Sequence, residues 1–168
     1  MRKLLFAIGL VLLGSGLIFT SCSKDDDDDS GSQSFEYNGK TYNLDNGYMD
    51  LYGSTSDGVY NIDLYLLSDG VLGSTSTGNG VYFEMYTNSE NELTAGTYTY
   101  NSSEANFTFD IGEFYMNYDF YEEVGDYTYI KSGTVKVEKS SSIYTITIDC
   151  VDIDGKEIKG SYVGSLMI

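Results

Sequence analysis

Three aspartates near the C-terminus carry oxygen atoms that could coordinate a metal ion. They are Asp149, Asp152 and Asp154. Ca²⁺ prefers hard oxygen ligands, so the three form a candidate calcium site. Two observations count against the site. Asp149 and Asp152 should point to opposite faces of a strand, and Asp154 is already explained by the Asp154-Gly155 turn pair. No cofactor is expected apart from this candidate ion.

A second acidic group could supply the paired carboxylates of a glycosidase. It consists of Glu122, Glu123 and Asp126. Adjacent residues of a strand point to opposite faces, however, and a solvated loop explains the group better. The chain also contains no His, the commonest general base and the usual partner of a nucleophilic Ser or Cys. We therefore predict that the protein is not an enzyme.

The N-terminus has the pattern of a secretory signal peptide. Arg2 and Lys3 form a cationic start, and an apolar stretch follows from residue 4 to Phe19. At about 16 residues the stretch is short for a membrane span, which needs about 20. We predict a signal peptide over residues 1–21. An uncleaved anchor or an ordinary secretory signal is the alternative.

Cys22 is the candidate lipidation site. The small residues Thr20 and Ser21 precede it, as a cleavage site requires. The segment resembles a lipobox, although Phe19 stands where Leu or a relative is usual. The resemblance implies that the Cys22 thiol receives a diacylglyceryl group and that its freed amine is acylated. The lipid bilayer would then be a partner, held through several acyl chains.

An acidic run follows the cysteine, and residues 22–33 are predicted to form a flexible, self-repelling tether. The leader, Cys22 and this run together resemble surface lipoproteins of the Bacteroidetes type, whose function is unknown. The resemblance implies an export signal and a lipid-anchored position on the outer membrane, facing the cell exterior rather than the periplasm. The residues of the implied signal are Ser23, Lys24, Asp25, Asp26, Asp27, Asp28 and Asp29.

Cys150 is the second cysteine of the chain. It shares the apolar face of a predicted strand with Tyr144, Ile146 and Ile148. A buried Cys behaves as a small hydrophobic residue, so a packing role is expected rather than a reactive one. With Cys22 lipidated, no internal disulfide is expected.

Tyrosine is abundant, with 17 residues and no Trp. Strands with aromatic residues on both faces leave some rings outside the core, where they could stack on sugars or anchor a protein partner. The candidate contacts are Tyr98 and Tyr100, which share a face, and Tyr115 and Tyr121, which lie opposite the face of Phe114. The alternative is that tyrosine simply populates strand faces.

Residues 34–168 are predicted to form one all-β domain. Two hairpins are clear, because Asn38-Gly39 and Asp154-Gly155 accept the positive φ of tight turns. Apolar and polar residues alternate within the segments between turns, as in Val135 and Val137 against Lys136. The fold class is a single antiparallel β-sandwich or flattened β-barrel with meander hairpins. The expected strands cover residues 35–37, 40–42, 48–52, 59–67, 80–87, 97–101, 106–111, 113–121, 127–131, 134–139, 143–153 and 156–163.

The net charge of −17 excludes nucleic acid as a partner, because phosphate backbones require clustered cations. The leading functional hypothesis is a membrane-anchored, non-enzymatic binding or assembly module for a glycan or a protein. The alternative is a β-barrel carrier of a small hydrophobic ligand, suggested by Gly160 and Gly164 beside Tyr162.

Overall fold

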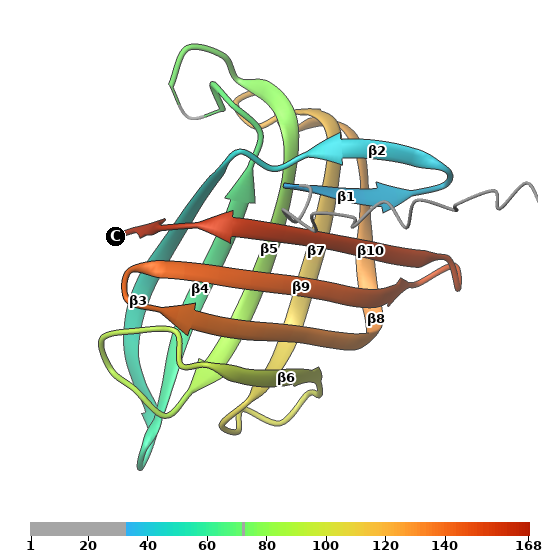
Figure 1. Cartoon of the computed structure of the whole chain (residues 1–168). Coiled ribbons are helices and arrows are strands. Elements are labelled where there is room, and N and C mark those ends of the chain that lie inside the picture. Colours follow the sequence, from blue (N-terminus) through green and yellow to red (C-terminus); the bar gives the residue numbers. More distant parts are fainter. Residues whose placement is uncertain (1–32, 72) are drawn as a thin grey trace, which may run out of the picture.

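Eleven strands form one strongly curled sheet in the computed structural model, which describes residues 33–71 and 73–168 (Figure 1). This confirms the all-β prediction. The strands are β1 (Ser34–Tyr37), β2 (Lys40–Asn43), β3 (Asn46–Ser56), β4 (Val59–Leu67), β5 (Thr77–Thr87), β6 (Gly96–Tyr100), β7 (Thr108–Asp119), β8 (Val124–Ser140), β9 (Ile143–Asp152), β10 (Glu157–Gly164) and β11 (Leu166–Met167).

The sheet curls until one part of it lies across the other. Its strand order is β11-β3-β4-β5-β7-β6-β8-β9-β10-β1-β2. In Figure 1 β9 and β10 run across β3, β4, β5 and β7, so these two groups of strands make two layers. Only Ser165 separates the end of β10 from the start of β11, which pairs with β3 at the other end of the order. The result is a half-barrel, in agreement with the predicted sandwich or flattened barrel.

The long strand β8 belongs to both layers. Its first part pairs with β7, through pairs such as Tyr129 with Glu113, and its second part pairs with β9. A register shift between Ile130 and Ser132 marks the bend, and Gly133 follows it with φ +135°. The sequence predicted two strands here, at 127–131 and 134–139. The prediction was wrong because pairing continues through the glycine.

The bounds of strand β7 also differ from the prediction. Residues 106–111 and 113–121 were expected as separate strands, but Thr108–Asp119 is continuous. Gly112 does not interrupt it; the residue lies beneath Ile130, where an added Cβ would be 2.9 Å from a side-chain carbon. Most strand pairs are antiparallel as predicted, whereas β6 with β7 and β11 with β3 are parallel. The short strand β11 was not predicted.

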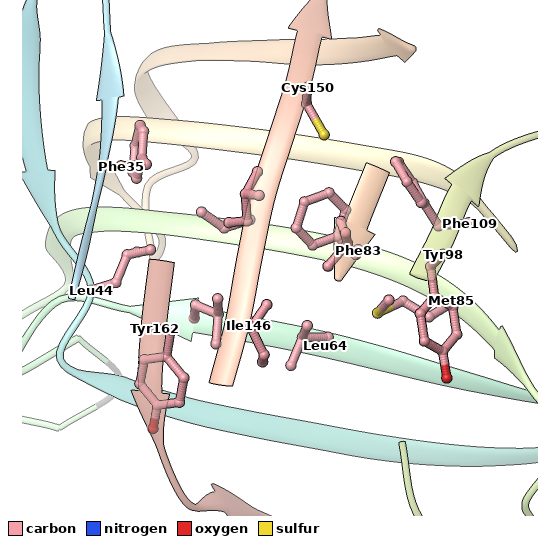
Figure 2. Packing of buried hydrophobic residues seen from close by; sticks show 14 of the residues in the cluster. Phe35, Leu44, Leu64, Phe83, Met85, Tyr98, Phe109, Ile146, Cys150 and Tyr162 are labelled. Atoms are coloured by element: carbon pink, nitrogen blue, oxygen red, sulfur yellow. The ribbon is translucent and has the colours of Figure 1, made fainter. Parts of the chain in front are cut away.

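The core lies between the two layers (Figure 2). The ring of Phe83 meets Phe109 and Phe114 edge to face, with centroids 5.1 and 5.8 Å apart. On β9 the predicted apolar face is buried, Cys150 included. Gly160 and Gly164, which suggested a hollow interior, lie in close contact with neighbouring atoms: an added Cβ would be 2.8 Å from Cβ of Phe35 and 2.4 Å from the hydroxyl oxygen of Tyr162.

Candidate functional site: an outer tyrosine groove

Tyrosines line the outer face of the layer made by β4, β5 and β7. Side chains alternate along a strand, so Leu64 and Phe83 enter the core while Tyr65 and Tyr82 face outward. The register pairs Tyr65 with Tyr82, and their rings stack with centroids 5.1 Å apart and planes 29° apart. On β7, Tyr115 lies on the same outer face. Residues distant in sequence therefore form one aromatic surface.

A groove runs between these rings. It is lined by Tyr65, Leu67, Tyr82, Glu113, Tyr115 and Phe120 and has a volume of about 290 Å³. We call it the outer tyrosine groove. Phe120 closes one end, where the chain leaves β7; its ring lies over Gly80, at which an added Cβ would be only 3.0 Å from the ring. The ring of Tyr115 lies 5.2 Å from that of Phe120.

Phe120 also borders a second hollow of about 360 Å³. Its other lining residues are Gly73, Ser74, Thr75, Ser76 and Tyr121. Tyr121 is 83% exposed. The two hollows meet at a single ring, so a ligand longer than one ring could extend from the groove into the second hollow.

Carboxylates hold the groove tyrosines in place. Asp63 accepts a hydrogen bond of 3.1 Å from the hydroxyl of Tyr65 and another of 3.1 Å from that of Tyr82. The hydroxyl of Tyr115 donates to Glu113. Each hydroxyl is thereby turned toward an anion, which restricts the orientation of its ring.

Burial and negative charge keep these hydroxyls protonated. Burial, and then the charge of Asp63, raises the pKa of Tyr65 and of Tyr82 well above the ordinary tyrosine value. Burial and the hydrogen bond to Glu113 do the same for the pKa of Tyr115. Burial also raises the pKa of Asp63. The tyrosines of the groove are therefore neutral phenols at neutral pH.

The four predicted tyrosine contacts have different fates. Tyr98 is fully buried and donates a 2.8 Å hydrogen bond to the carbonyl of Thr94, so its prediction as an exposed contact is corrected. Tyr100 packs edge to face on Phe109 at the side of the core. The outer groove and the second hollow contain Tyr115 and Tyr121 respectively.

The sequence did not single out Tyr65, Tyr82, Glu113 or Phe120 as groove residues. Alternation in residues 59–67 and 80–87 could have placed the first two opposite the core. Nothing local could have shown that β4, β5 and β7 lie side by side, which is what assembles the groove.

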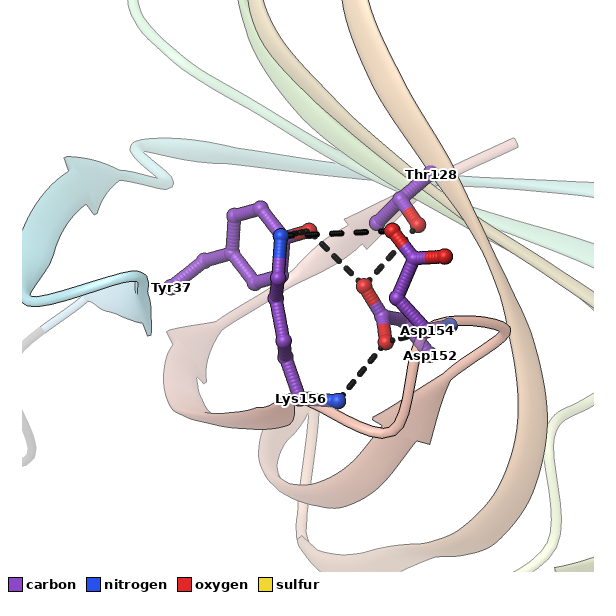
Figure 3. Close-up of polar contacts among 5 residues, drawn as sticks. All are labelled: Tyr37, Thr128, Asp152, Asp154 and Lys156. Carbon is purple, nitrogen blue, oxygen red and sulfur yellow. Dashed lines mark hydrogen bonds and ion pairs between the residues drawn. The ribbon is translucent and has the colours of Figure 1, made fainter.

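The predicted calcium site is also corrected. Both oxygens of buried Asp152 already accept hydrogen bonds: Oδ2 from Tyr37 and Thr128, and Oδ1 from the backbone of Asp154 and Lys156 (Figure 3). Asp154 is exposed in the turn, and Asp149 faces solvent on the other side of β9. Over the described residues, no group of three His, Cys, Asp or Glu side chains could hold a metal ion.

The remaining reactive side chains lie away from the groove. Cys150 is fully buried, and burial raises the pKa of its thiol to about 12. Glu122 and Glu123 are exposed in the turn after β7, as a solvated loop requires. The predicted lipidation site Cys22 and the residues of the predicted export signal lie outside the described residues. Between residues 33 and 168, Leu72 aside, no helix is long and apolar enough to cross a membrane.

Comparison with known proteins found no matching family model, no matching curated protein and no matching solved structure. The features of this protein that bear on function are therefore the outer tyrosine groove and the sequence of the N-terminus.

Proposed function

We propose that this protein is a lipid-anchored, non-enzymatic binding module on the outer membrane that binds a glycan in the outer tyrosine groove. The observation that carries the proposal is a groove lined by four aromatic rings together with the carboxyl group of Glu113. Sugar rings have apolar C–H faces that stack on aromatic rings, and hydroxyls that donate to carboxylates. A glycan needs both kinds of contact at once.

The dimensions of the groove agree with this ligand. Its volume of about 290 Å³ lies at the small end of the range for ligand pockets, which suits one or two sugar residues. The rings of Tyr65 and Tyr82, which both line the groove, supply apolar surface for the C–H face of a sugar. The second hollow beyond Phe120 provides room for a chain that continues past the groove.

Binding rather than catalysis is proposed because the carboxylates at the groove serve to position its tyrosines, while they keep further lone pairs for a ligand. Asp63 and Glu113 accept hydrogen bonds from groove tyrosines, and the chain contains no His to act as a general base. Anchoring through acylated Cys22 and display by the acidic tether would hold such a module where extracellular glycans are met.

The test is a glycan-binding assay on the full-length protein, purified from membranes in detergent, with a Tyr82→Ala variant. Removing one stacking face should weaken the affinity by about tenfold or more. Tyr60→Ala is the matched control, since Tyr60 is partly exposed near the start of β4 and does not line the groove. Circular dichroism verifies that both variants fold. Absence of binding across a broad neutral, cationic and anionic panel, or equal affinity in both variants, contradicts the proposal.

A further inference from the structure

The layer that bears the groove has no positive charge of its own. Between Thr41 and Ile130 the sequence contains no Lys, Arg or His. That stretch includes all of β3, β4, β5, β6 and β7. The lysines of the described residues lie elsewhere, on β2, on the second part of β8, and on β10 with the turn before it: Lys40, Lys131, Lys136, Lys139, Lys156 and Lys159. The strands that bear the groove therefore carry carboxylates and no cationic side chain.

Several carboxylates lie at the groove or next to it. Glu113 lines it, and Asp63 holds two of its rings. Glu84 is the register partner of Asp63 on the outer face and accepts a 2.7 Å hydrogen bond from Asn61. A cleft lined by one sign of charge raises the local concentration of the opposite charge and repels its own. Anionic sugars are disfavoured on this ground.

The aromatic rings that line the groove also favour a cationic ligand. The face of an aromatic ring is negative and attracts an ammonium group, more strongly where water is displaced. The hydroxyls of Tyr65, Tyr82 and Tyr115 donate to carboxylates, which increases the electron density of their rings. An ammonium group in the groove would meet ring faces and the Glu113 carboxylate together.

We propose that the ligand of the outer tyrosine groove is a glycan that carries free, protonated amines, that is, an amino sugar without its acyl groups. This inference rests on the proposed function and specifies its ligand. The sugar ring stacks on the Tyr65–Tyr82 pair while its ammonium group pairs with Glu113. A lysine-rich peptide also carries ammonium groups. Its flexible side chains, however, contain no ring that could stack on Tyr65 and Tyr82, and they lose more rotamer entropy when ordered.

The experiment compares three small probes on the full-length, detergent-solubilised protein by calorimetry at physiological salt and mildly acidic pH. The probes are a glucosamine trimer, an N-acetylglucosamine trimer and trilysine. The glucosamine trimer should bind about tenfold more tightly than the acetylated trimer. In Glu113→Gln, which retains an acceptor for Tyr115, this preference should disappear, because the affinity for the glucosamine trimer falls further than the affinity for the acetylated trimer.

Asp57→Asn is the matched charge control. It removes one exposed carboxylate from the β3–β4 turn of the same layer and keeps a residue that suits the turn before Gly58. The control should retain the preference. If both variants lose the preference for the glucosamine trimer equally, the preference reflects a general attraction between charges. The proposed contact between the ammonium group and Glu113 would then be overturned.

The relative affinities of the three probes decide which kind of ligand the groove binds. Equal affinity for the two sugar trimers overturns the inference that the ligand carries free amines, and it leaves the proposed glycan binding intact. Tighter binding of trilysine than of the glucosamine trimer overturns the glycan in favour of a basic peptide. If neither sugar trimer binds, the inference is overturned, and the broad glycan panel decides separately whether the proposed function stands.

Discussion

The hydroxyl of Tyr37 donates a 2.7 Å hydrogen bond to Asp152, 115 residues further along the chain. This bond joins the first hairpin to the turn between β9 and β10, and Thr128 of β8 donates to the same oxygen. Burial by itself raises the pKa of Asp152, but the hydrogen bonds from Lys156 backbone N–H, Tyr37 and Thr128 outweigh it and hold the pKa below its usual range. A buried carboxylate so fully bonded supports the fold.

Asp152→Asn should therefore lower the free energy of unfolding at neutral pH by about 1–3 kcal/mol. Because the pKa of Asp152 is lower in the folded state than in the unfolded one, its stabilising effect is complete above the unfolded value of about 4. The effect is lost as the pH falls through the depressed folded value. Urea unfolding across the acid range should show the two proteins converging at low pH. A difference in the free energy of unfolding that stays constant across the acid range would contradict this role of Asp152.

Gly133→Ala should destabilise the protein by about 3 kcal/mol, measured by urea unfolding. Its φ of +135° is unfavourable for any other residue, and the added Cβ would lie 2.5 Å from the carbonyl oxygen of Asp149. Gly39→Ala is the control, because Gly39 has φ +70° with no atom within 4 Å of the new Cβ. Its cost should be about 1 kcal/mol. Equal costs would mean that the β8 bend does not depend on the close approach.

The thiol of Cys150 should be unreactive in the folded protein. It is fully buried, and its pKa of about 12 leaves little thiolate at neutral pH. The measurement is alkylation of a full-length Cys22→Ser chain, in which Cys150 is the remaining cysteine. Labelling should be slow under native conditions and rapid in denaturant. Rapid native labelling would show that β9 opens or that the thiol is accessible.

Replacement of Asp25, Asp26, Asp27, Asp28 and Asp29 by Ser tests the proposed export signal. We expect external protease or antibody to reach the wild-type domain on intact cells and not the variant. Both proteins should remain lipid-anchored, which a membrane fraction verifies. If both are shielded, the acidic run serves only as a spacer and the domain faces the periplasm.

The sequence by itself determined the β class and most of the strands, because alternation and turn residues are local properties. Residues 59–67 carry their own pattern of inward leucines and outward tyrosine, and the β4 bounds match the prediction. Cys150 was likewise placed in the core by the residues on its own strand. Such features need no knowledge of what lies next to the strand.

Tertiary structure decided what the strands bring together. In residues 97–101 one face carries Tyr98 and Tyr100 and the other carries threonines, and only packing against Phe107 and Phe109 shows that the tyrosines face inward. Tyr65, Tyr82 and Tyr115 share a groove because β4, β5 and β7 are neighbours and because β7 runs unbroken past Gly112. Strand neighbours and bends depend on burial across the whole sheet, which no single segment encodes.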